Sequence, residues 1–575
     1  MLQQDRWLAV ALLLSLACES FAGPAQPVSQ GASVNPATRF SSLAQIDRHN
    51  VGQLKLAFTF RTGRLGAQGS APLLWGTKLL ILSAFPHTLF ALDLTRPNGT
   101  ISWQLTPAAN RVVDGLHCCD RIHLGPISNG NRVYIGTLDG HVIAVDPQHG
   151  QPVWDVAVAD PALGETLASA PTLAQDRLIV GNAGDDFGAR GWIAALDSNT
   201  GRTLWKRYST GPDQDVGTRR EFQPSRPEDS GIDLGTHSWP GTSWQHGGGS
   251  VSGWTLYDPT LQLLFHNTGP AAPWNPEPRP GNNLWTAGVF ARDPRTGEAR
   301  WFTGLHRHGL YGWRNGSANL ILEHAWGGSA RSLLIHPDAD GRLYVMDRKT
   351  GELLAADSFL SEPRAQKTSS TAPIPRTNLQ VRNICPAWVG AVGADAALDE
   401  ATSWLYIPVS RLCMDLEDRS ANYIQGTPFI GANVRVNSNS AARGELVAWN
   451  IVARKAVWRI PERLPIAADT LVTRGGVVFY GTLDGMLKAV DAHTGALLWQ
   501  FKTAAALTGQ PTTYEGPDGR QYIAVVAGAS GPYGLAQQAW IDRRDATAAR
   551  GLARVMANVD PPRDPSGTLY VFGLP

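Results

Sequence analysis

Hydrophobic and polar positions repeat along this chain in one recurring unit. Each unit is a short, mostly apolar strand that ends in Asp, a turn that contains Gly, and a second strand that in most copies ends in Trp. Asp accepts backbone hydrogen bonds within the turn and Gly tolerates a positive φ, so each unit predicts a β-hairpin. The copies are FALDLTRPNGTISW (90–103), VIAVDPQHGQPVW (142–154), IAALDSNTGRTLW (193–205), VFARDPRTGEARW (289–301), LYVMDRKTGELLA (343–355), the degenerate LVAWNIVARKAVW (446–458) and LKAVDAHTGALLW (487–499).

The spacing of these units predicts the fold. Neighbouring copies lie about 40–55 residues apart, or about twice that, which is the length of a four-stranded propeller blade. Seven units need one further blade to close a ring, and the C-terminal strand TLYVFGLP (568–575) has no partner in its own part of the sequence. We therefore predict an all-β, eight-bladed β-propeller with tryptophan-docking-type blade repeats. The C-terminal strand is expected to pair near Leu54–Thr62, which removes the open sheet edges.

The N-terminus predicts export. Arg6 precedes the apolar run WLAVALLLSLA (7–17), and Ser20-Phe21-Ala22 provides a small-x-small cleavage site. We interpret 1–22 as a signal peptide and 23–575 as a single propeller domain with loop insertions near 212–248 and 356–390. The apolar run is too short for a lasting membrane span, so we expect a periplasmic protein without stable membrane insertion.

Composition and charge narrow the classes of partner. The 575 residues carry a formal net charge of +1, which implies no nucleic-acid partner. After cleavage four cysteines remain, and an even number in an exported protein predicts the disulfides Cys118–Cys119 and Cys385–Cys413. The chain has no Cys-x-x-Cys-His motif, so we expect no covalently attached haem.

The adjacent cysteines Cys118 and Cys119 are unusual. Their Cα atoms lie about 3.8 Å apart across a trans peptide, below the roughly 4.4–6.8 Å of relaxed disulfides. A bridge between neighbours closes no loop and adds little through chain entropy. Its expected use is a rigid sulfur-faced plate against a flat ligand; the alternative is inherited structure that has lost its ligand.

Several further segments carry a family resemblance. They are RVYIGTLDGHVIAVD (132–146), GARGWIAALDSNTGRTLWKRYSTGPD (188–213), APWNPEPRPGNNLWT (272–286), NICP (383–386), RLCMDLE (411–417) and VVFYGTLDGMLKAVD (477–491). With the vicinal cysteines, they resemble the quinoprotein (PQQ-dependent) alcohol dehydrogenases, and most closely the methanol dehydrogenase large subunit. The resemblance runs from about Phe40 to the end of the chain. It implies an oxidoreductase that oxidises a small alcohol or similar small-molecule substrate and passes electrons to a separate cytochrome c.

The resemblance also implies a site. In that family pyrroloquinoline quinone (PQQ) lies in the central funnel, between the vicinal disulfide and a tryptophan and beside a calcium or lanthanide ion. Matching positions imply cofactor contacts at Cys118, Cys119, Gly184 and Ser250. They imply a metal ligand at Asp186 in NAGDDFG (182–188), where the family has Glu.

The chain departs from the family at other site positions. Pro270 stands where the family has its metal-binding Asn, and the position of the catalytic base falls on Trp313 in HRHGLYGWRNG (306–316). An indole cannot accept a proton. Further metal- or cofactor-contacting positions of the family are occupied by Gly69, Leu124, Ser252, Asn315, Ala339 and Gly393.

These replacements leave two alternatives open. One is a catalytically silent propeller that binds a ligand or partner. The other is an enzyme that holds copper or another transition metal through Asp186 and funnel histidines, since imidazole suits such metals. His306 and His308 would share a face if they lay on a strand, and adjacent Asp185 and Asp186 would point to opposite faces. On that basis Asp185 is expected to be solvated or to cap a turn. The other histidines in segments that the family places at or near the funnel are His117, His123, His246 and His266.

Overall fold

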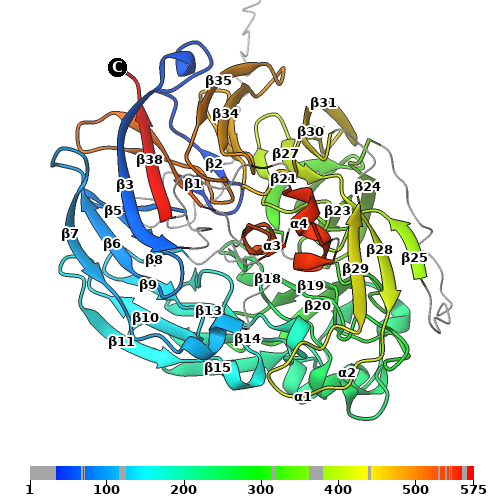
Figure 1. Cartoon of the computed structure of the whole chain (residues 1–575). Helices are drawn as coiled ribbons and strands as arrows, with labels where there is room; N and C mark the ends of the chain where they lie inside the picture. Colours follow the sequence, from blue (N-terminus) through cyan, green and yellow to red (C-terminus); the bar gives the residue numbers. More distant parts are fainter. Residues whose placement is uncertain are drawn as a thin grey trace, which may run out of the picture.

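The fold is a β-propeller, with sheets arranged around a central axis (Figure 1). The computed structural model describes residues 34–65, 69, 71–115, 125–219, 221–313, 317–361, 380–437, 442–528, 531–537, 541–542, 544–545, 547–557, 559 and 566–575. Within these ranges, no helix combines the length and apolar character needed to cross a membrane. The all-β prediction is confirmed.

Nine sheets lie within the described residues. The first four are β4–β7 (Leu73–Trp75, Lys78–Leu82, Leu89–Asp93, Thr100–Leu105), β8–β11 (Ile127–Ser128, Val133–Gly136, His141–Val145, Pro152–Ala157), β12–β15 (Thr172–Ala174, Arg177–Gly181, Trp192–Asp197, Thr203–Tyr208) and β16–β20 (Gln223–Pro224, Leu256–Asp258, Leu263–Thr268, Gly288–Arg292, Ala299–Gly304).

The remaining sheets follow in chain order, apart from strands contributed by the N-terminal segment. They are β21–β24 (Leu320–Trp326, Ser329–Pro337, Arg342–Asp347, Leu353–Ser358), β25-β28-β29 (Gln380–Ile384, Cys413–Asp418, Ala432–Asn437), β26-β27-β30-β31 (Ala397–Asp399, Trp404–Ser410, Gly444–Asn450, Lys455–Glu462), β1-β2-β32-β33-β34-β35 (Val34–Asn35, Phe40–Ser41, Leu471–Thr473, Val477–Gly481, Met486–Asp491, Leu497–Lys502) and β3-β38-β37-β36 (Lys55–Leu65, Ser566–Gly573, Gln521–Ala527, Thr512–Glu515).

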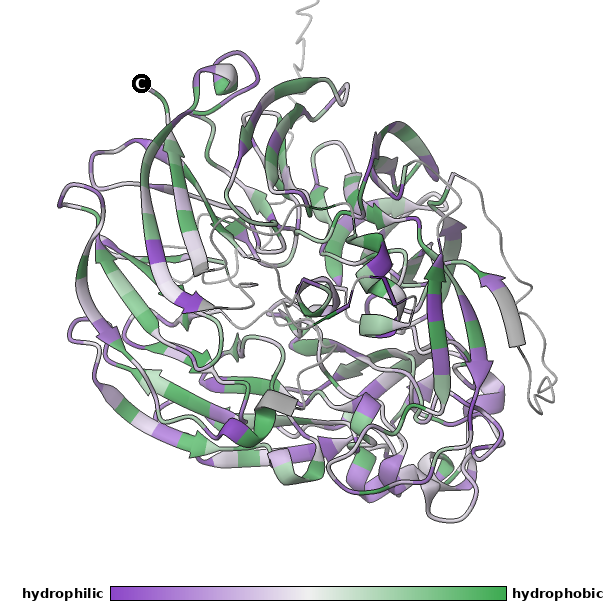
Figure 2. Ribbon diagram, viewed as in Figure 1, coloured by the Kyte–Doolittle hydropathy of each residue, from purple (hydrophilic) through white to green (hydrophobic). Residues whose placement is uncertain are grey.

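All seven predicted hairpins form where the repeat places them. In the second, the Asp146 carboxylate accepts the Gln148 N–H at 2.8 Å, and the Gly150 N–H donates to the Asp146 carbonyl at 2.8 Å. Hydrophobic residues lie along the middle strands, while outer strands alternate with polar residues (Figure 2). The alternating pattern therefore reports which face of each outer strand packs on the sheet beside it.

Tryptophans join neighbouring sheets. Six of the seven units end in Trp, and each indole N–H donates to a backbone carbonyl of the next sheet at 3.0–3.3 Å. In five of these pairs the ring also lies against the glycine of the next hairpin turn, as Trp301 does on Gly351. The indoles belong to Trp103, Trp154, Trp205, Trp301, Trp458 and Trp499.

The two ends of the described chain close the ring. Strand β38 lies between β3 and β37, and its antiparallel register with β3 pairs Lys55 with Gly573 and Phe60 with Leu569. The predicted pairing of the C-terminal strand with the region of residues 54–62 is confirmed. Ring closure leaves this strand with no free edge.

The N-terminal segment 34–41 contacts three different sheets. The backbone carbonyls of Ala37, Thr38 and Ser41 accept N–H groups of Ile321, Leu398 and Arg474, respectively, at 3.2, 2.7 and 2.8 Å. The buried Arg39 pairs with Asp395 at 2.6 Å and with Asp469 at 3.5 Å. A cavity of about 240 Å³ between this segment and the first strands of several sheets is lined by Arg39, Trp254 and Asn319, among others.

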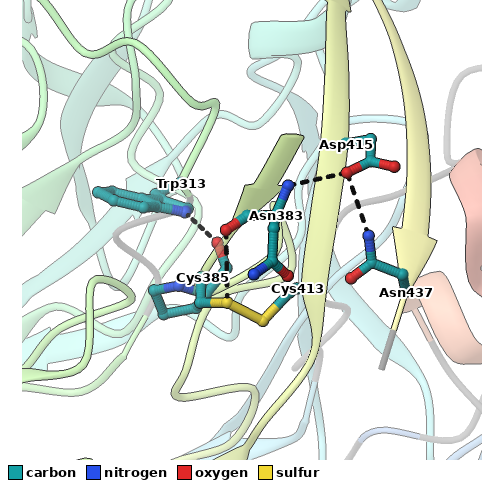
Figure 3. Close-up of a disulfide and its surroundings, with 7 residues drawn as sticks. Trp313, Asn383, Cys385, Cys413, Asp415 and Asn437 are labelled. Atoms are coloured by element: carbon teal, nitrogen blue, oxygen red, sulfur yellow. Dashed lines mark hydrogen bonds between the residues drawn. A yellow bond between two sulfur atoms is a disulfide. The ribbon is translucent and has the colours of Figure 1, made fainter. Parts of the chain in front are cut away.

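The predicted disulfide Cys385–Cys413 is present and joins the start of β28 to the residue after β25 (Figure 3). The Asp415 carboxylate beside it accepts the Asn383 N–H at 2.8 Å and the Asn437 amide at 3.2 Å. The Trp313 indole donates to the carbonyl of Pro386 at 3.0 Å. The bridge thus fixes the backbone against which Trp313 lies.

The Trp301–Gly351 contact predicts a stability difference between two glycine variants. Gly351 has φ +75° and an added Cβ would lie 2.6 Å from the Trp301 ring, whereas Gly327 has φ +60° and nothing within 4 Å of that position. Gly327→Ala should therefore cost only the backbone term, about 1 kcal/mol, and Gly351→Ala about 2–4 kcal/mol of unfolding free energy. Urea unfolding of both variants measures the difference; equal losses would contradict the inter-sheet contact.

Candidate functional site

The Asp185-Asp186 pair lies in a short 3-10 helix, η4 (Asp185–Phe187), between β13 and β14. Both carboxylates are buried, at 3% and 4% exposure. Gly184 precedes them with φ 127°, and a Cβ there would lie 2.2 Å from the Gly164 carbonyl. The expectation of a strand with a solvated or turn-capping Asp185 is wrong, because the tight turn at Gly184 places both side chains in the interior.

Asp185 binds the segment that contains Ser250. Its carboxylate accepts the Ser250 N–H at 2.7 Å and the Ser250 hydroxyl at 2.6 Å. A Cβ on Gly269 would lie 2.2 Å from the same carboxylate. The N–H and the hydroxyl of Ser250 are therefore both engaged by a carboxylate of the chain itself.

Asp186 is paired with a cation from the far end of the chain. The Arg550 guanidinium donates to the Asp186 carboxylate at 2.6 Å, with the two side chains 15% and 5% exposed. The same guanidinium lies 5.6 Å from the Trp274 ring centroid and 5.4 Å from that of Trp388. Figure 1 places helices α3 (Gly531–Leu535) and α4 (Leu552–Val555), which flank this arginine, over the centre of the ring.

The aromatic wall beside Arg550 is held by a fully buried arginine. Trp274, Trp388 and Trp313 belong to one buried cluster with residues of α4. Arg279 donates to the carbonyls of Pro273, Trp274, His308 and Gly309 at 2.6–3.3 Å. It thereby fixes the loop after β18 against the loop after β20.

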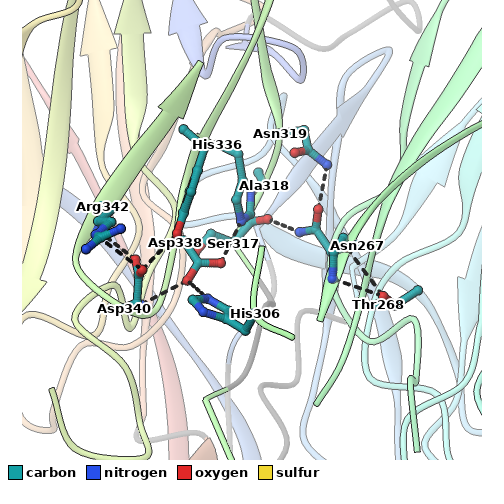
Figure 4. A network of polar contacts seen from close by, with 12 residues as sticks. Asn267, Thr268, His306, Ser317, Ala318, Asn319, His336, Asp338, Asp340 and Arg342 are labelled. Atoms are coloured by element: carbon teal, nitrogen blue, oxygen red, sulfur yellow. Dashed lines mark hydrogen bonds and ion pairs between the residues drawn. The ribbon is translucent and has the colours of Figure 1, made fainter. Parts of the chain in front are cut away.

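Figure 4 shows a second polar cluster, around His306, Asp338 and Asp340. The His306 ring lies 5.6 Å from that of Trp313. His306 Nε2 lies 2.7 Å from one oxygen of Asp338, and His336 Nε2 lies 3.2 Å from the other. Asp340 accepts the Tyr344 hydroxyl at 2.9 Å. His306, Asp338 and Asp340 each offer a ligand atom within 4.8 Å of the others, so this group could hold a metal ion.

The charges in this cluster shift one another's pKa. Burial alone would lower the pKa of His306, but the charge of Asp338 and the hydrogen bond to it outweigh burial and raise that pKa to about 9. Burial and the neighbouring Asp338 raise the pKa of Asp340 to about 6. Burial also acts to raise the pKa of Asp338, but the charge of His306 holds it well below its usual value. At neutral pH, His306 is cationic and both carboxylates are mainly ionised.

The other predicted histidines fall in different surroundings. The assumption that His306 and His308 share a strand face is wrong, because β20 ends at Gly304 and His308 has φ 60° and contacts Asn283 at 2.9 Å. His266 is fully buried against Arg292 at 2.9 Å, and His246 stacks on Tyr423 at 3.5 Å. Burial lowers the pKa of both. Cys118, Cys119, His117, His123, Leu124 and Asn315 lie outside the described residues.

Sequence reasoning missed Arg550, Asp338 and Asp340. The two aspartates flank Ala339 in PDADG, where the family resemblance points only to the alanine between them. Their Asp-x-Asp-Gly turn was the available signal. Arg550 had no local signal, since its partner lies 364 residues away.

Comparison with known proteins shows the family. The sequence model described as "Glucose/ethanol/alcohol dehydrogenase, beta-propeller domain" (PQQ) matches residues 31–385 and 436–523. The chain belongs to this family. It is 36% identical over 553 residues to the "Lanthanide-dependent methanol dehydrogenase" of Methylacidiphilum fumariolicum (strain SolV), covering 93% of this chain and 90% of that protein.

Two further relatives of this dehydrogenase-family chain are informative. "Methanol dehydrogenase (cytochrome c) subunit 1" of Methylorubrum extorquens is 35% identical over 562 residues, 93% of this chain and 89% of that protein. The solved structure titled "Europium-containing methanol dehydrogenase" superposes with a TM-score of 0.90 at 35% identity, covering 96% of this chain and 98% of that one. The predicted resemblance to PQQ-dependent alcohol and methanol dehydrogenases is confirmed.

The described residues do not fit a metal ion at the position that the resemblance implies. A hard cation takes six to eight oxygen ligands. Here Asp186 is bound to a guanidinium, Pro270 offers no side-chain oxygen, and the Trp313 indole is engaged by a carbonyl. The Arg550 guanidinium that Asp186 binds lies instead beside the buried rings of Trp274 and Trp388.

The His306–Asp338 pair predicts a pH-dependent stability. The pKa of His306 is raised from its unfolded-state value near 6.5 to about 9, so its contribution is complete below about pH 6.5 and is lost as the pH rises through 9. We expect about 3 kcal/mol of unfolding free energy to disappear between pH 6.5 and 9.5.

Denaturant unfolding at these two pH values measures that loss. His306→Gln should flatten the difference, whereas the exposed control His149→Gln should retain it. An unchanged pH dependence in His306→Gln would contradict the ion pair.

Proposed function

We propose that this protein is an exported oxidoreductase that oxidises a small alcohol or similar substrate with PQQ and passes electrons to a separate cytochrome c. The single observation that carries the proposal is the family match along nearly the whole chain, with a TM-score of 0.90 to a methanol dehydrogenase. A relative's name includes cytochrome c, which supports the acceptor. The runner-up is a catalytically silent propeller, and a transition-metal enzyme is the third reading.

We further propose that the propeller has eight blades with tryptophan docking. Eight of the nine sheets have four or more strands, and the three-stranded sheet β25-β28-β29 is an insertion. Six indoles link successive sheets. Apolar contacts complete the ring at the other two junctions, between the sheets β21–β24 and β26-β27-β30-β31 and between the sheets of β4–β7 and β36–β38. On this proposal residues 23–575 are one domain, with insertions near 212–248 and 356–390.

Export to the periplasm through the signal peptide 1–22 remains part of the proposal, although that segment lies outside the described residues. The vicinal pair Cys118–Cys119 is proposed to face the quinone. Gly184 and Ser250 then act indirectly, because Gly184 allows the turn that presents Asp185 and Ser250 is held by that carboxylate.

PQQ, when bound, supplies the two-electron oxidation, and the chain must supply a place for the alcohol proton. Trp313 cannot accept it. In the cluster whose His306 ring lies 5.6 Å from Trp313, the Asp340 carboxylate is the described group best suited to the task, because a pKa of about 6 leaves it ionised yet basic near neutral pH. His306, with a pKa of about 9, already carries its proton and holds Asp338 in place.

A binding titration with PQQ tests the proposal. Calorimetry of the mature, oxidised protein should give micromolar or tighter affinity, and dye-linked assays should then give alcohol oxidation. No binding at tens of micromolar would remove the quinone chemistry and leave the silent propeller.

The proton acceptor is tested separately. Asp340→Asn should lower kcat by about 10²–10⁴ while leaving the PQQ affinity unchanged. The exposed control Glu515→Gln should change neither. A fully active Asp340→Asn enzyme would rule out the assigned role.

A further inference from the structure

A metal ion at Asp186 would need at least one oxygen of that carboxylate as a ligand. The Asp186 carboxylate is 5% exposed, so a metal ion could bind it only by displacing the group that already contacts it. The contact is Arg550, at 2.6 Å, within the range of strong charge-assisted hydrogen bonds. A cation therefore already lies where a metal would have to enter.

The surroundings of Arg550 suit a guanidinium and not a hydrated metal ion. Its planar group lies near Trp274 and Trp388, both 1% exposed or less, at distances where cation–π attraction contributes. An aromatic wall offers a guanidinium favourable contacts on its faces, but offers Ca²⁺ or a lanthanide no oxygen ligand.

The backbone holds Arg550 in this orientation. Ala549 and Arg550 both have left-handed φ values, 49° and 53°, which cost free energy in residues with a side chain. The Trp388 indole donates to the Arg550 carbonyl at 3.2 Å, and Leu552, Val555 and Met556 pack into the same buried cluster as the two tryptophans. The conformation is maintained by this packing and aims the side chain at Asp186.

We infer that the Arg550 guanidinium is the resident cation at Asp186, where the family resemblance implies a metal ion, so that the chain binds no metal ion there. The Asp186–Arg550 ion pair is observed in the structure. The inference that it replaces a metal ion beside a quinone rests on the proposed function. The inference deepens that function, since cofactor binding would then be independent of metal.

Terbium luminescence tests the inference directly. Tb³⁺ prefers oxygen ligands, as calcium and lanthanides do, and its emission is sensitised by nearby tryptophan, here Trp274 and Trp388. After dialysis against EDTA, the wild-type protein and the Asp186→Asn variant should show the same sensitised Tb³⁺ emission, because Asp186 binds no Tb³⁺ in the wild type. Arg550→Gln should remove the cation from Asp186 and raise Tb³⁺ affinity at least tenfold, and the double variant Asp186→Asn/Arg550→Gln should lose that gain.

Matched variants distinguish the loss of the Arg550 charge from a general folding defect. Arg554→Gln removes an exposed arginine one turn further along the same segment and should behave as wild type. Arg550→Lys keeps a cation and should also gain no Tb³⁺ site. Arg550→Gln should lower the apparent Tm by roughly 2–5 °C, because a buried charge loses its partner, and Asp186→Asn in addition should recover part of that loss.

Three results would overturn the inference. They are a tight Tb³⁺ site in the wild type that Asp186→Asn abolishes, an Arg550→Gln variant with wild-type Tm and no gain in Tb³⁺ affinity, and strictly additive Tm losses in the double variant. The wild-type Tm should shift by less than 1 °C on adding EDTA, Ca²⁺ or La³⁺, as metal-independence requires.

The outcome is distinguishable from that of the proposed function. If PQQ does not bind but the terbium and Tm results hold, the quinone chemistry fails and the internal cation stands. If PQQ binds only together with a metal ion that Asp186→Asn removes, the oxidoreductase stands and the internal cation fails.

Discussion

The ring depends on indoles that reach from the last strand of one sheet to the hairpin turn of the next. A four-stranded sheet with two apolar faces cannot bury both alone, so each must be covered by its neighbours. The Trp301 contact illustrates how: the indole donates to the Arg348 carbonyl, and its ring lies on Gly351, where a Cβ would collide. Since the chain must return to its starting sheet, the pairing of β3 with β38 fixes the last of these contacts.

The rigidity of that ring makes the site possible. The loops between the second and third strands of several sheets, together with the connections from sheet to sheet, supply the site residues, including Asp185, Ser250 and Asp338. Arg279 illustrates the support that such loops need, because one guanidinium satisfies four backbone carbonyls from two connections. Buried carbonyls without partners would cost more than the arginine does.

Buried charge in this protein is neutralised by its own side chains. Asp186 meets Arg550, Asp338 meets His306, and Arg39 meets Asp395 and Asp469. Each removes a charge from water and regains stability only through close geometry and further hydrogen bonds. In each case a buried carboxylate is compensated by a cationic side chain from another part of the chain.

The sequence by itself determined the architecture of this protein. Its Asp–Gly turns and terminal tryptophans are local chemistry repeated along the chain, so the hairpins and the ring closure could be predicted. The Cys385–Cys413 bridge could be predicted from the even number of cysteines. Only the tertiary structure decided what the site contains. Asp186 and Arg550 lie 364 residues apart, and Asp338 reaches His306 from another connection. No local pattern encodes such encounters, because the distance between two charges is set by how the sheets pack around the axis.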